Sequence, residues 1–537
     1  MQYLLALTML AVPASAVSLW PQPTGSVSTG SEQLFVAPSF AFRLAGATAD
    51  SAVMTKAADR YVQLINAAVS EVPQDSAPLL ASCSVDVSSV SADADEERKT
   101  LQQGMDEAYS LQVSGGQDAV CSIEARTVWG ALRALETFTQ LLTREGPSVV
   151  LSGAPLKLSD APAYSHRGLM IDTSRHYLDV RTIEHVVDTV SMSKMSVLHW
   201  HAVDAESFPL VTPSSPHLAD GAYSPTAVYS MQDVAHLVAY AADRGVRLIV
   251  EINSPGHAAS WTKGYPDVMA KCFKKYSYNY NDFAVNPTLD KTYDVVGGAY
   301  ADVLAQTQDA FMHLGGDEVV YGCWDEDADI TAYKKEHGID SNDQLYGMYI
   351  SRAGGMAGAL GATPVHWQEA FIAYDRSEGV VKDAFQFQAG TAFQVWQGDG
   401  TLVSDITAAN FSCIASPNAY WYLDYATSTW DVMYYYDPAA SLTETQRTKL
   451  MGGEAVMFAE MVDGNNFDSQ TQPRATAVAE RLWSDRAALP DDISADRRYD
   501  TDKDETKARL MDMRCRMRNR GVRAAPIAPD YCATNFV

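Results

Sequence analysis

The sequence predicts an α/β protein in which a small N-terminal domain of sheet and helices precedes a closed (β/α)8 barrel of the TIM type. Three observations predict this fold. The 537 residues are 47% hydrophobic and only 20% charged, so the chain can bury large cores. Beyond about residue 160, apolar β-prone runs alternate with helical segments, which favours parallel strands. Charged or aromatic residues follow these runs, as they do at the mouth of a barrel, where active sites lie.

Residues 1–16 have the pattern of a signal peptide. Residues 4–12 are mostly apolar, and Ala14-Ser15-Ala16 offers small side chains for cleavage. The alternative is a buried first strand or helix. No later stretch reaches the ~18 uncharged apolar residues that a membrane span needs. We therefore expect a secreted protein, or one delivered to a lysosome-like compartment.

The N-terminal α/β domain is expected over residues 17–160. Its clearest element is a helix over residues 126–142, in which Val128, Leu132 and Leu135 recur at helical spacing. Residues 91–100 are highly charged and predict a solvated loop. The proline-bearing stretch 155–162 is the expected joint between the domains.

The catalytic barrel is expected over residues 161–537, and eight strands can be counted in it. Their alternation with helices implies parallel pairing, and eight such units imply a closed barrel. The expected strands are residues 168–172, 197–204, 246–253, 310–318, 363–369, 392–396, 411–420 and 455–462.

The residues at or just past the C-terminal ends of these strands are the candidate site. They combine carboxylates, an arginine and aromatic rings, which suits a sugar: rings stack on its apolar faces while charged groups bind its hydroxyls. In chain order they are Arg175, Asp204, His257, Asp317 with Glu318, Trp367 with Glu369, Trp396, Tyr422 and Glu460.

The hexapeptide His313-Leu314-Gly315-Gly316-Asp317-Glu318 carries most of the chemical argument. Neighbouring strand residues point to opposite sides, so Asp317 and Glu318 do not form the pair of carboxyls, ~5 Å or more apart, that most glycosidases place across the scissile bond. Adjacent carboxyls fit substrate-assisted catalysis, in which a 2-acetamido oxygen of the sugar is the nucleophile. The alternative is a solvated Asp-Glu pair at a strand end.

Several further motifs occur in a fixed order along nearly the whole mature chain. They are Thr127-Val128-Trp129-Gly130-Ala131-Leu132, His166-Arg167-Gly168, Asp172-Thr173-Ser174-Arg175-His176-Tyr177, His199-Trp200-His201, Ser254-Pro255-Gly256-His257, Trp421-Tyr422-Leu423 and Ala479-Glu480-Arg481-Leu482-Trp483-Ser484. With the hexapeptide, these motifs make the chain resemble the β-N-acetylhexosaminidases of glycoside hydrolase family 20.

The resemblance implies a role for each candidate residue. Glu318 would be the general acid/base, Asp317 would orient and polarise the acetamido group, and Asp204 with His257 would form a relay that supports Glu318. The substrate-binding residues would line the pocket or hold the sugar hydroxyls; they are Arg175, Trp367, Trp396, Tyr422, Phe458, Glu460 and, at the rim, Asp424. A carboxylate at the rim would disfavour sulfated or uronic sugars.

No cofactor and no metal are implied. His199 and His201 lie inside an expected strand, where packing or support of the site is their ordinary role. Together with Asp204 they suggest metal ligands, but the barrel offers no further histidine at a suitable position.

Two positions depart from the family pattern. Asn253 stands where the family usually has Asp, so we expect a neighbour such as Arg175 to lose an ionic partner. Phe458 stands where the family usually has Trp, which removes an indole N–H and leaves a smaller ring. Both changes predict a roomier pocket with a weaker grip on the substrate.

The resemblance also implies three disulfides: Cys83–Cys121, Cys272–Cys323 and Cys515–Cys532. Cys413 lies in an apolar run and is expected as a buried free thiol. Asn410 heads the one acceptable glycosylation sequon. A basic run from Arg514 to Arg523 is expected on the solvated face of the last helix.

The predicted function is therefore a retaining exo-β-N-acetylhexosaminidase that acts on glycans or chitooligosaccharides. The formal charge of −27 excludes a general nucleic-acid binder and argues against docking on anionic membranes. Relatives often dimerise, so the resemblance implies a homodimer. The alternatives are a catalytically weak or silent carbohydrate-binding protein on the same scaffold, and a relative that releases disaccharides.

Overall fold

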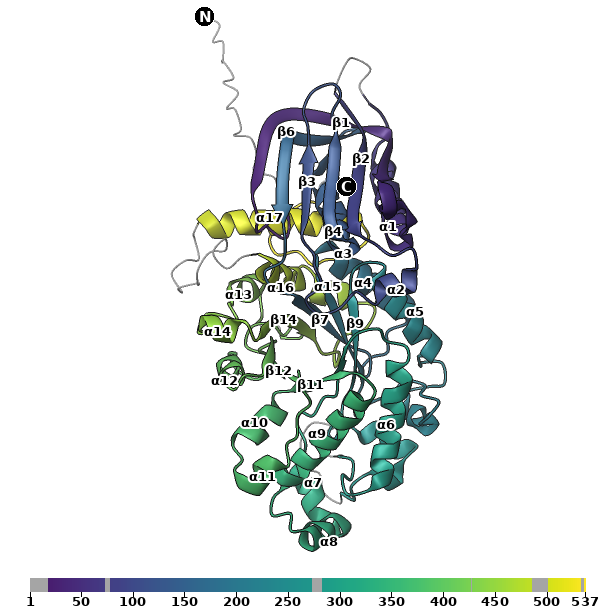
Figure 1. The fold of residues 1–537 in the computed structure, drawn as a ribbon, viewed down its shortest axis with the longest axis vertical. Coiled ribbons are helices and arrows are strands. Elements are labelled where there is room, and N and C mark those ends of the chain that lie inside the picture. The colour runs from purple at the N-terminus through teal and green to yellow at the C-terminus, as the bar shows by residue number, and fades with distance from the viewer. Residues whose placement is uncertain (1–17, 73–77, 273–282, 426, 485–500, 533–535) are drawn as a thin grey trace, which may run out of the picture.

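Figure 1 shows a sheet-containing N-terminal region stacked on a barrel, with the long helix α17 lying between them. This computed structural model describes residues 18–72, 78–272, 283–425, 427–484, 501–532 and 536–537. The predicted signal peptide lies outside the described residues. None of the helices in the described ranges is long and apolar enough to cross a membrane.

The N-terminal region is a six-stranded sheet covered by helices. Its strand order is β1-β2-β4-β3-β6-β5, and β1 also pairs with β6. The strands are β1 (Val27–Leu44), β2 (Leu79–Ser89), β3 (Tyr109–Val113), β4 (Cys121–Thr127), β5 (Leu142–Glu145) and β6 (Ser148–Asp160). The helical segments are η1 (Gly46–Asp50), α1 (Ala52–Ala68), α2 (Ala94–Arg98) and α3 (Val128–Gln140).

Helix α3 is the helix predicted over residues 126–142. It begins two residues later because the Thr127 side chain caps it by accepting a hydrogen bond from the Gly130 amide. Its apolar face is buried in the sheet's core, as the spacing of Val128, Leu132 and Leu135 predicted.

The second region is a closed barrel of eight parallel strands in chain order, which confirms the predicted fold class. The strands are β7 (His166–Asp172), β8 (Val197–Val203), β9 (Arg247–Ile252), β10 (Phe311–His313), β11 (Thr363–Trp367), β12 (Ala392–Val395), β13 (Ser412–Ala415) and β14 (Leu450–Met457).

Helices surround the barrel and connect its strands (Figure 1). They are α4 (Val180–Met192), η2 (Pro216–Gly221), α5 (Met231–Ala242), η3 (Ala259–Lys263), η4 (Pro266–Val268), α6 (Asp290–Leu304), α7 (Tyr321–Glu326), α8 (Ala328–His337), α9 (Asn342–Ala359), α10 (Glu369–Asp375), α11 (Gly379–Asp383), α12 (Leu402–Ala408), α13 (Trp430–Tyr435), α14 (Glu444–Arg447), α15 (Phe467–Thr471), α16 (Arg474–Trp483) and α17 (Thr501–Asn519).

Two barrel strands differ from prediction in ways that matter for the site. Strand β10 ends at His313, because Gly315 and Gly316 take φ values of +69° and +102°, outside the β region. The adjacent carboxylates therefore lie on a loop, not in a strand. Strand β14 begins five residues earlier than predicted, because Gly453 lets the strand approach the neighbouring backbone: a Cβ there would lie 2.3 Å from the Ala415 carbonyl oxygen.

Buried ion pairs join the N-terminal region to the N-terminal ends of the barrel strands. Glu107 accepts from Arg133 at 2.8 Å and from Arg167 at 2.6 Å, and all three side chains are almost fully buried. Lys194 lies 3.2 Å from Asp160. The expected joint is shorter than predicted, because β6 runs through Pro155 to Asp160. The division of the chain at residue 160 stays a prediction.

Two charged runs predicted to be solvated are partly buried at this junction. Glu97 and Arg98 belong to the short helix α2, and Arg98 pairs with Asp243 at 2.7 Å. Arg514 and Arg516 on α17 are buried, and Arg516 donates to the Gln140 carbonyl at the end of α3. The expectations are therefore wrong for these four buried residues, of which Arg98 and Arg516 have partners on distant elements. They hold for most of residues 91–100 and for Arg518 and Arg523, which are exposed.

Candidate active site

The loops after the barrel strands bring Asp204, His257, Asp317 and Glu318 together. His257 Nδ1 lies 2.9 Å from Asp204 Oδ1, and its Nε2 lies 3.3 Å from Asp317 Oδ2 and 3.6 Å from Glu318 Oε2. One imidazole thus links a fully buried carboxylate to both candidate catalytic carboxylates. The side chain of Glu318 is 35% exposed, so of these groups it is the one that most clearly meets solvent.

The backbone of this loop is unusual at the catalytic position itself. Glu318 has φ of +49° and His257 has φ of +53°, both in the left-handed region that non-glycine residues rarely adopt. Such strain persists where surrounding contacts enforce it, and it is common at active sites. Because neighbouring residues of a strand alternate, the sequence predicted Asp317 and Glu318 on opposite sides. This alternation does not apply, because both residues lie on a loop after two glycines. Their side chains instead approach the same nitrogen, Nε2 of His257.

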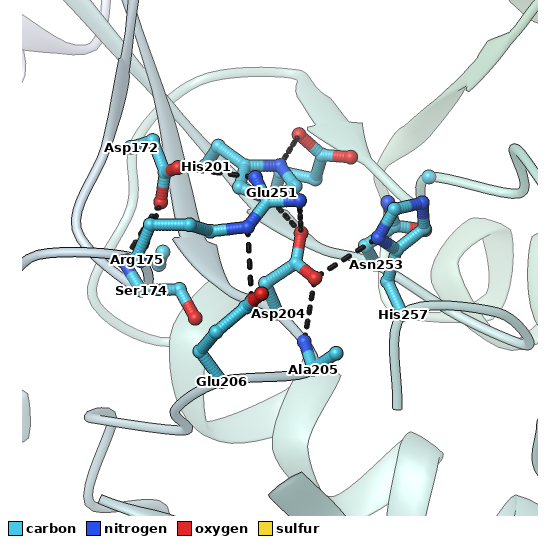
Figure 2. A network of polar contacts seen from close by, with 12 residues as sticks. Asp172, Ser174, Arg175, His201, Asp204, Ala205, Glu206, Glu251, Asn253 and His257 are labelled. Atoms are coloured by element: carbon cyan, nitrogen blue, oxygen red, sulfur yellow. Dashed lines mark hydrogen bonds and ion pairs between the residues drawn. The ribbon is translucent and has the colours of Figure 1, made fainter. Parts of the chain in front are cut away.

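Arg175 lies beside this relay among four carboxylates, three of which are labelled in Figure 2. Its guanidinium is within 3.0 Å of oxygens on each of three of them, and 3.9 Å from Glu460; the four are Asp172, Asp204, Glu206 and Glu460. Asn253 was expected to cost a neighbour such as Arg175 an ionic partner, but Asn253 bonds Asp317 and Gly316 while Arg175 pairs with these other carboxylates, so Arg175 is not the neighbour affected. Asp172, the last residue of β7, and Glu206, which follows β8, were given no role from the sequence.

The charges of the relay are set by these contacts. Burial alone would raise the pKa of Asp204, but Arg175 and His257 hold it well below its usual range. Burial alone would lower the pKa of His257, but Asp204 and Asp317 raise it well above its usual value. Asp204 is thus an anion and His257 a cation at neutral pH.

The relay continues into the barrel as an alternating series of histidines and carboxylates. Each link is a contact of 2.6–3.0 Å, and the order is His166, Glu454, His199, Glu251, His201 and Asp204. Burial opposes charge on every histidine of the series, but the carboxylates raise the pKa of His199 to about 9 and that of His201 to about 10. The histidines hold the pKa values of Glu251 and Glu454 below their usual range, against the effect of burial.

Sequence reasoning missed Glu251 and Glu454, although one signal for them existed. Each is the one carboxylate in its strand, where its neighbours are apolar or small apart from Arg247 at the start of β9, and a buried charge needs a partner. The expectation that no further histidine lies near His199 is also wrong: His313 stacks on it at 4.5 Å. His199, Glu251 and His313 have possible metal-ligand atoms within 4.8 Å of one another. However, both ring nitrogens of His199 already form hydrogen bonds with carboxylates, those of Glu251 and Glu454. We assign no metal to them.

Aromatic side chains form the other side of the candidate site. Trp367 and Tyr422 belong to a small buried cluster, and Trp396 and Phe458 pack against it. The Trp367 indole donates to Glu251 at 2.8 Å, so the same carboxylate holds the aromatic wall and the histidine series. Phe458 also lies 5.1 Å below the Arg175 guanidinium. These contacts place the predicted pocket residues side by side.

Two further carboxyl groups have pKa values raised into the neutral range. Glu369 accepts from the Trp396 indole at 3.0 Å, and its burial together with Asp317 raises its pKa to about 8. Asp424 is exposed just after Tyr422 and Leu423, where partial loss of surrounding water and the Glu460 carboxylate raise its pKa to about 7. Its place at the rim of the pocket stays a prediction. Asp424 is mainly neutral in acid, so its predicted repulsion of anionic sugars applies only near and above neutral pH.

Asn253 does not face Arg175 as expected. It lies just after β9, and in the described part of the chain its side chain bonds Asp317 and the Gly316 amide. Phe458 occupies the predicted place, and the roomier pocket stays a prediction.

The three predicted disulfides are present, and Cys413 is free and buried. Asn410 is exposed two residues before β13, and its glycosylation stays a prediction.

Comparisons with known proteins agree with this geometry. Residues 164–486 match the model of the glycosyl hydrolase family 20 catalytic domain, and residues 19–141 match a domain described as beta-acetyl hexosaminidase like. Beta-hexosaminidase 1 of Arabidopsis thaliana is 35% identical over 97% of this chain and 94% of its own length. The beta-hexosaminidase subunit beta of Mus musculus is 35% identical over 80% of this chain and 76% of its own.

Solved structures share the fold. The Flavobacterium johnsoniae chitobiase has a TM-score of 0.78 at 24% identity and covers 94% of this chain and 73% of its own. A Vibrio harveyi exo beta-N-acetylglucosaminidase in complex with N-acetylglucosamine has a TM-score of 0.76 at 19% identity and covers 96% of this chain and 79% of its own.

Proposed function

Because the chain belongs to glycosyl hydrolase family 20 and is a glycoside hydrolase of the β-N-acetylhexosaminidase type, we propose that it removes terminal β-linked GlcNAc or GalNAc with retention, through an oxazolinium intermediate. The single observation that carries the mechanism is that neighbouring Asp317 and Glu318 share the Nε2 of one imidazole. This arrangement suits one carboxyl for proton transfer and one for the acetamido group. The alternatives of a silent binding protein and of a disaccharide-releasing relative are not favoured.

In the first step the acetamido carbonyl oxygen attacks C1 and the bond from C1 to the leaving oxygen breaks. Glu318, as a carboxylic acid, gives its proton to that leaving oxygen. Asp317 accepts a hydrogen bond from the acetamido N–H and stabilises the positive charge that spreads over the forming ring. In the second step the Glu318 carboxylate takes a proton from water, which attacks C1 and reopens the ring.

The surrounding groups would prepare these two steps. Burial keeps the pKa of Tyr422 well above its usual value, so its hydroxyl remains a donor for the acetamido oxygen. Trp367 and Trp396 would wall the acetamido pocket. Arg175 and Glu460 would bind the sugar hydroxyls, since the guanidinium is held at fixed distances by the carboxylates around it.

Turnover of 4-nitrophenyl N-acetyl-β-D-glucosaminide tests the acid/base role. We expect Glu318→Gln to lower kcat by about 10²–10⁴-fold, chiefly because the second step loses the base that takes a proton from water; 4-nitrophenolate itself leaves with little need of a proton donor. Glu336→Gln on the exposed face of α8 is the matched control and should keep the wild-type rate. Equal rates for wild type and Glu318→Gln would end the proposed mechanism.

The role of the acetamido group needs its own test. Substrates whose acetyl group carries one, two or three fluorines have a progressively weaker nucleophilic oxygen, so kcat should fall along the series. If kcat does not change with the number of fluorines, the nucleophile is a group of the protein and not the acetamido oxygen. NMR of the first-formed product should show the β-anomer.

We also propose a secreted or lysosome-like location and a homodimer. The location is supported by the signal-peptide pattern and by three disulfides, which persist in oxidising compartments. Size-exclusion chromatography with light scattering tests the dimer.

A further inference from the structure

Asn253 is the side chain that contacts Asp317 from beneath. It is fully buried, its Nδ2 donates to Asp317 Oδ1 at 2.7 Å, and its Oδ1 accepts from the Gly316 amide at 3.0 Å. It also lies against Gly315, where a Cβ would be 1.8 Å from its Oδ1. The side chain therefore fits tightly beneath the turn that carries both carboxylates.

These two contacts fix which way the amide points. In the reverse orientation its oxygen would face the Asp317 carboxylate, and its NH2 group would face the Gly316 N–H. Both contacts would then be repulsive. The amide consequently presents an N–H to Asp317 in the orientation that satisfies both partners.

An amide N–H has no proton to lose in the range where enzymes work. A carboxyl group at the same place could bond Asp317 only while it is protonated, and two carboxyls at this distance titrate as a pair that shares one proton. When that proton leaves, the bond becomes a repulsion between two buried anions.

We propose that Asn253 is a positioning residue for Asp317: its N–H, which has no proton to lose where enzymes work, orients this carboxylate in the same way at every pH, whereas an acid at the same place would share a proton with it. The inference rests on the proposed function, in which Asp317 acts on the acetamido group. It concerns the one position where this chain replaces the acid usual in its family by an amide.

Other titratable groups face Asp317 and must be considered in any pH profile. From the loop after β9 comes His257, from its own loop Glu318, from α9 Tyr346, from α10 Glu369 and from the loop after β13 Tyr422. All of them are unchanged in a variant at position 253. The ratio of variant to wild-type kcat at each pH therefore isolates the substituted residue to first order.

Asn253→Asp and Asn253→Leu give opposite signatures. Protonated Asp can replace the amide, so Asn253→Asp should stay within about threefold of wild-type kcat near pH 4.5 and fall by more than about tenfold relative to wild type by pH 8. Asn253→Leu fills the space without a donor and should be impaired by about tenfold or more at every pH, because a bond to a charged group is lost.

Affinity for a thiazoline analogue of the oxazolinium ion provides a second readout, since its binding needs an anionic Asp317 but no proton from Glu318. Relative to wild type, this affinity should weaken with rising pH in Asn253→Asp. Thermal unfolding at each pH shows whether the variants are folded; if Asn253→Leu is not, Asn253→Asp still decides the matter.

The outcomes separate the two proposals. If Asp317→Asn keeps wild-type activity, the proposed function fails. If Asp317→Asn loses activity but Asn253→Asp follows wild type in both kcat and thiazoline affinity from pH 4.5 to pH 8, the amide only supports the Gly316 turn and this inference is overturned.

Discussion

Both ends of the barrel contain buried charged side chains, but only at the C-terminal end does one of these networks reach a side chain that is exposed to solvent. At the N-terminal end, Glu107 is enclosed between Arg133 and Arg167, and Arg247 is paired with Asp309 at 2.6 Å. At the mouth, a comparable network ends on Glu318, which is partly exposed and strained. The difference teaches that, of these buried networks, the one with a member that meets solvent lies at the candidate site. The enclosed network of Glu107, Arg133 and Arg167 joins the N-terminal region to the barrel.

The largest effect on stability should come from removing the central carboxylate of the enclosed network. Glu107→Gln leaves two buried guanidinium groups without a counter-charge, which costs about 3–5 kcal/mol of unfolding free energy. The melting temperature should fall strongly, while kcat per folded molecule stays within about twofold of wild type. Exposed Glu124→Gln on β4 is the control. A drop in kcat at an unchanged melting temperature would contradict the comparison.

A smaller effect is the dependence of stability on pH, which should differ between the histidine series and the arginine ion pairs. His199 and His201 have folded pKa values of about 9 and about 10, raised from 6.5, so their stabilisation is complete below about pH 6.5 and is lost as pH rises through those values. Glu251 and Glu454 have lowered pKa values, so their contribution is present above about pH 4.5 and is lost only well below it. Stability should therefore be highest between about pH 4.5 and 6.5, and the melting temperature should fall by roughly 5 °C or more towards pH 10.

Two variants test this assignment. Glu454→Gln removes the largest influence that raises the pKa of His199, so its melting temperature should be lower but should depend less on alkaline pH. Asp309→Asn, whose partner is an arginine, should lower the melting temperature without changing that dependence. Equal slopes in both variants would show that the histidine series does not titrate as described.

The smallest effect concerns the pocket wall at the mouth. Phe458→Trp restores the larger ring beside Arg175 and Tyr422 and should raise kcat/KM on the aryl substrate by about two- to tenfold. The gain should appear mainly in KM. No gain would mean that the pocket is not roomier at this position.

The sequence predicted the architecture and the catalytic residues of the site better than the contacts between its buried charged groups. Eight apolar runs sufficed for the barrel, and Asp317-Glu318 stood out because adjacent carboxylates after two glycines are unusual. The partners of buried charges were not predictable, because Glu454 meets His199 from 255 residues away and such pairing leaves no periodic pattern. The end of β10 was misjudged because the apolar run continues to Leu314 while the backbone has already turned. Asn253 was identified as unusual but assigned to the wrong neighbour.

Trp20 illustrates what this architecture demands during synthesis. Its indole donates to the Thr476 carbonyl on α16, and its ring packs in a cluster with Leu510, Met513 and Met517 of α17. Trp20 is synthesised early, but the helices that surround it are synthesised only after all the barrel strands. The N-terminal sheet can pair its own strands early, but its attachment to the barrel is a late event. Until then the Trp20 ring lacks these neighbours, so we expect the yield of folded enzyme to be sensitive to substitutions in α16 and α17, far from the catalytic mouth.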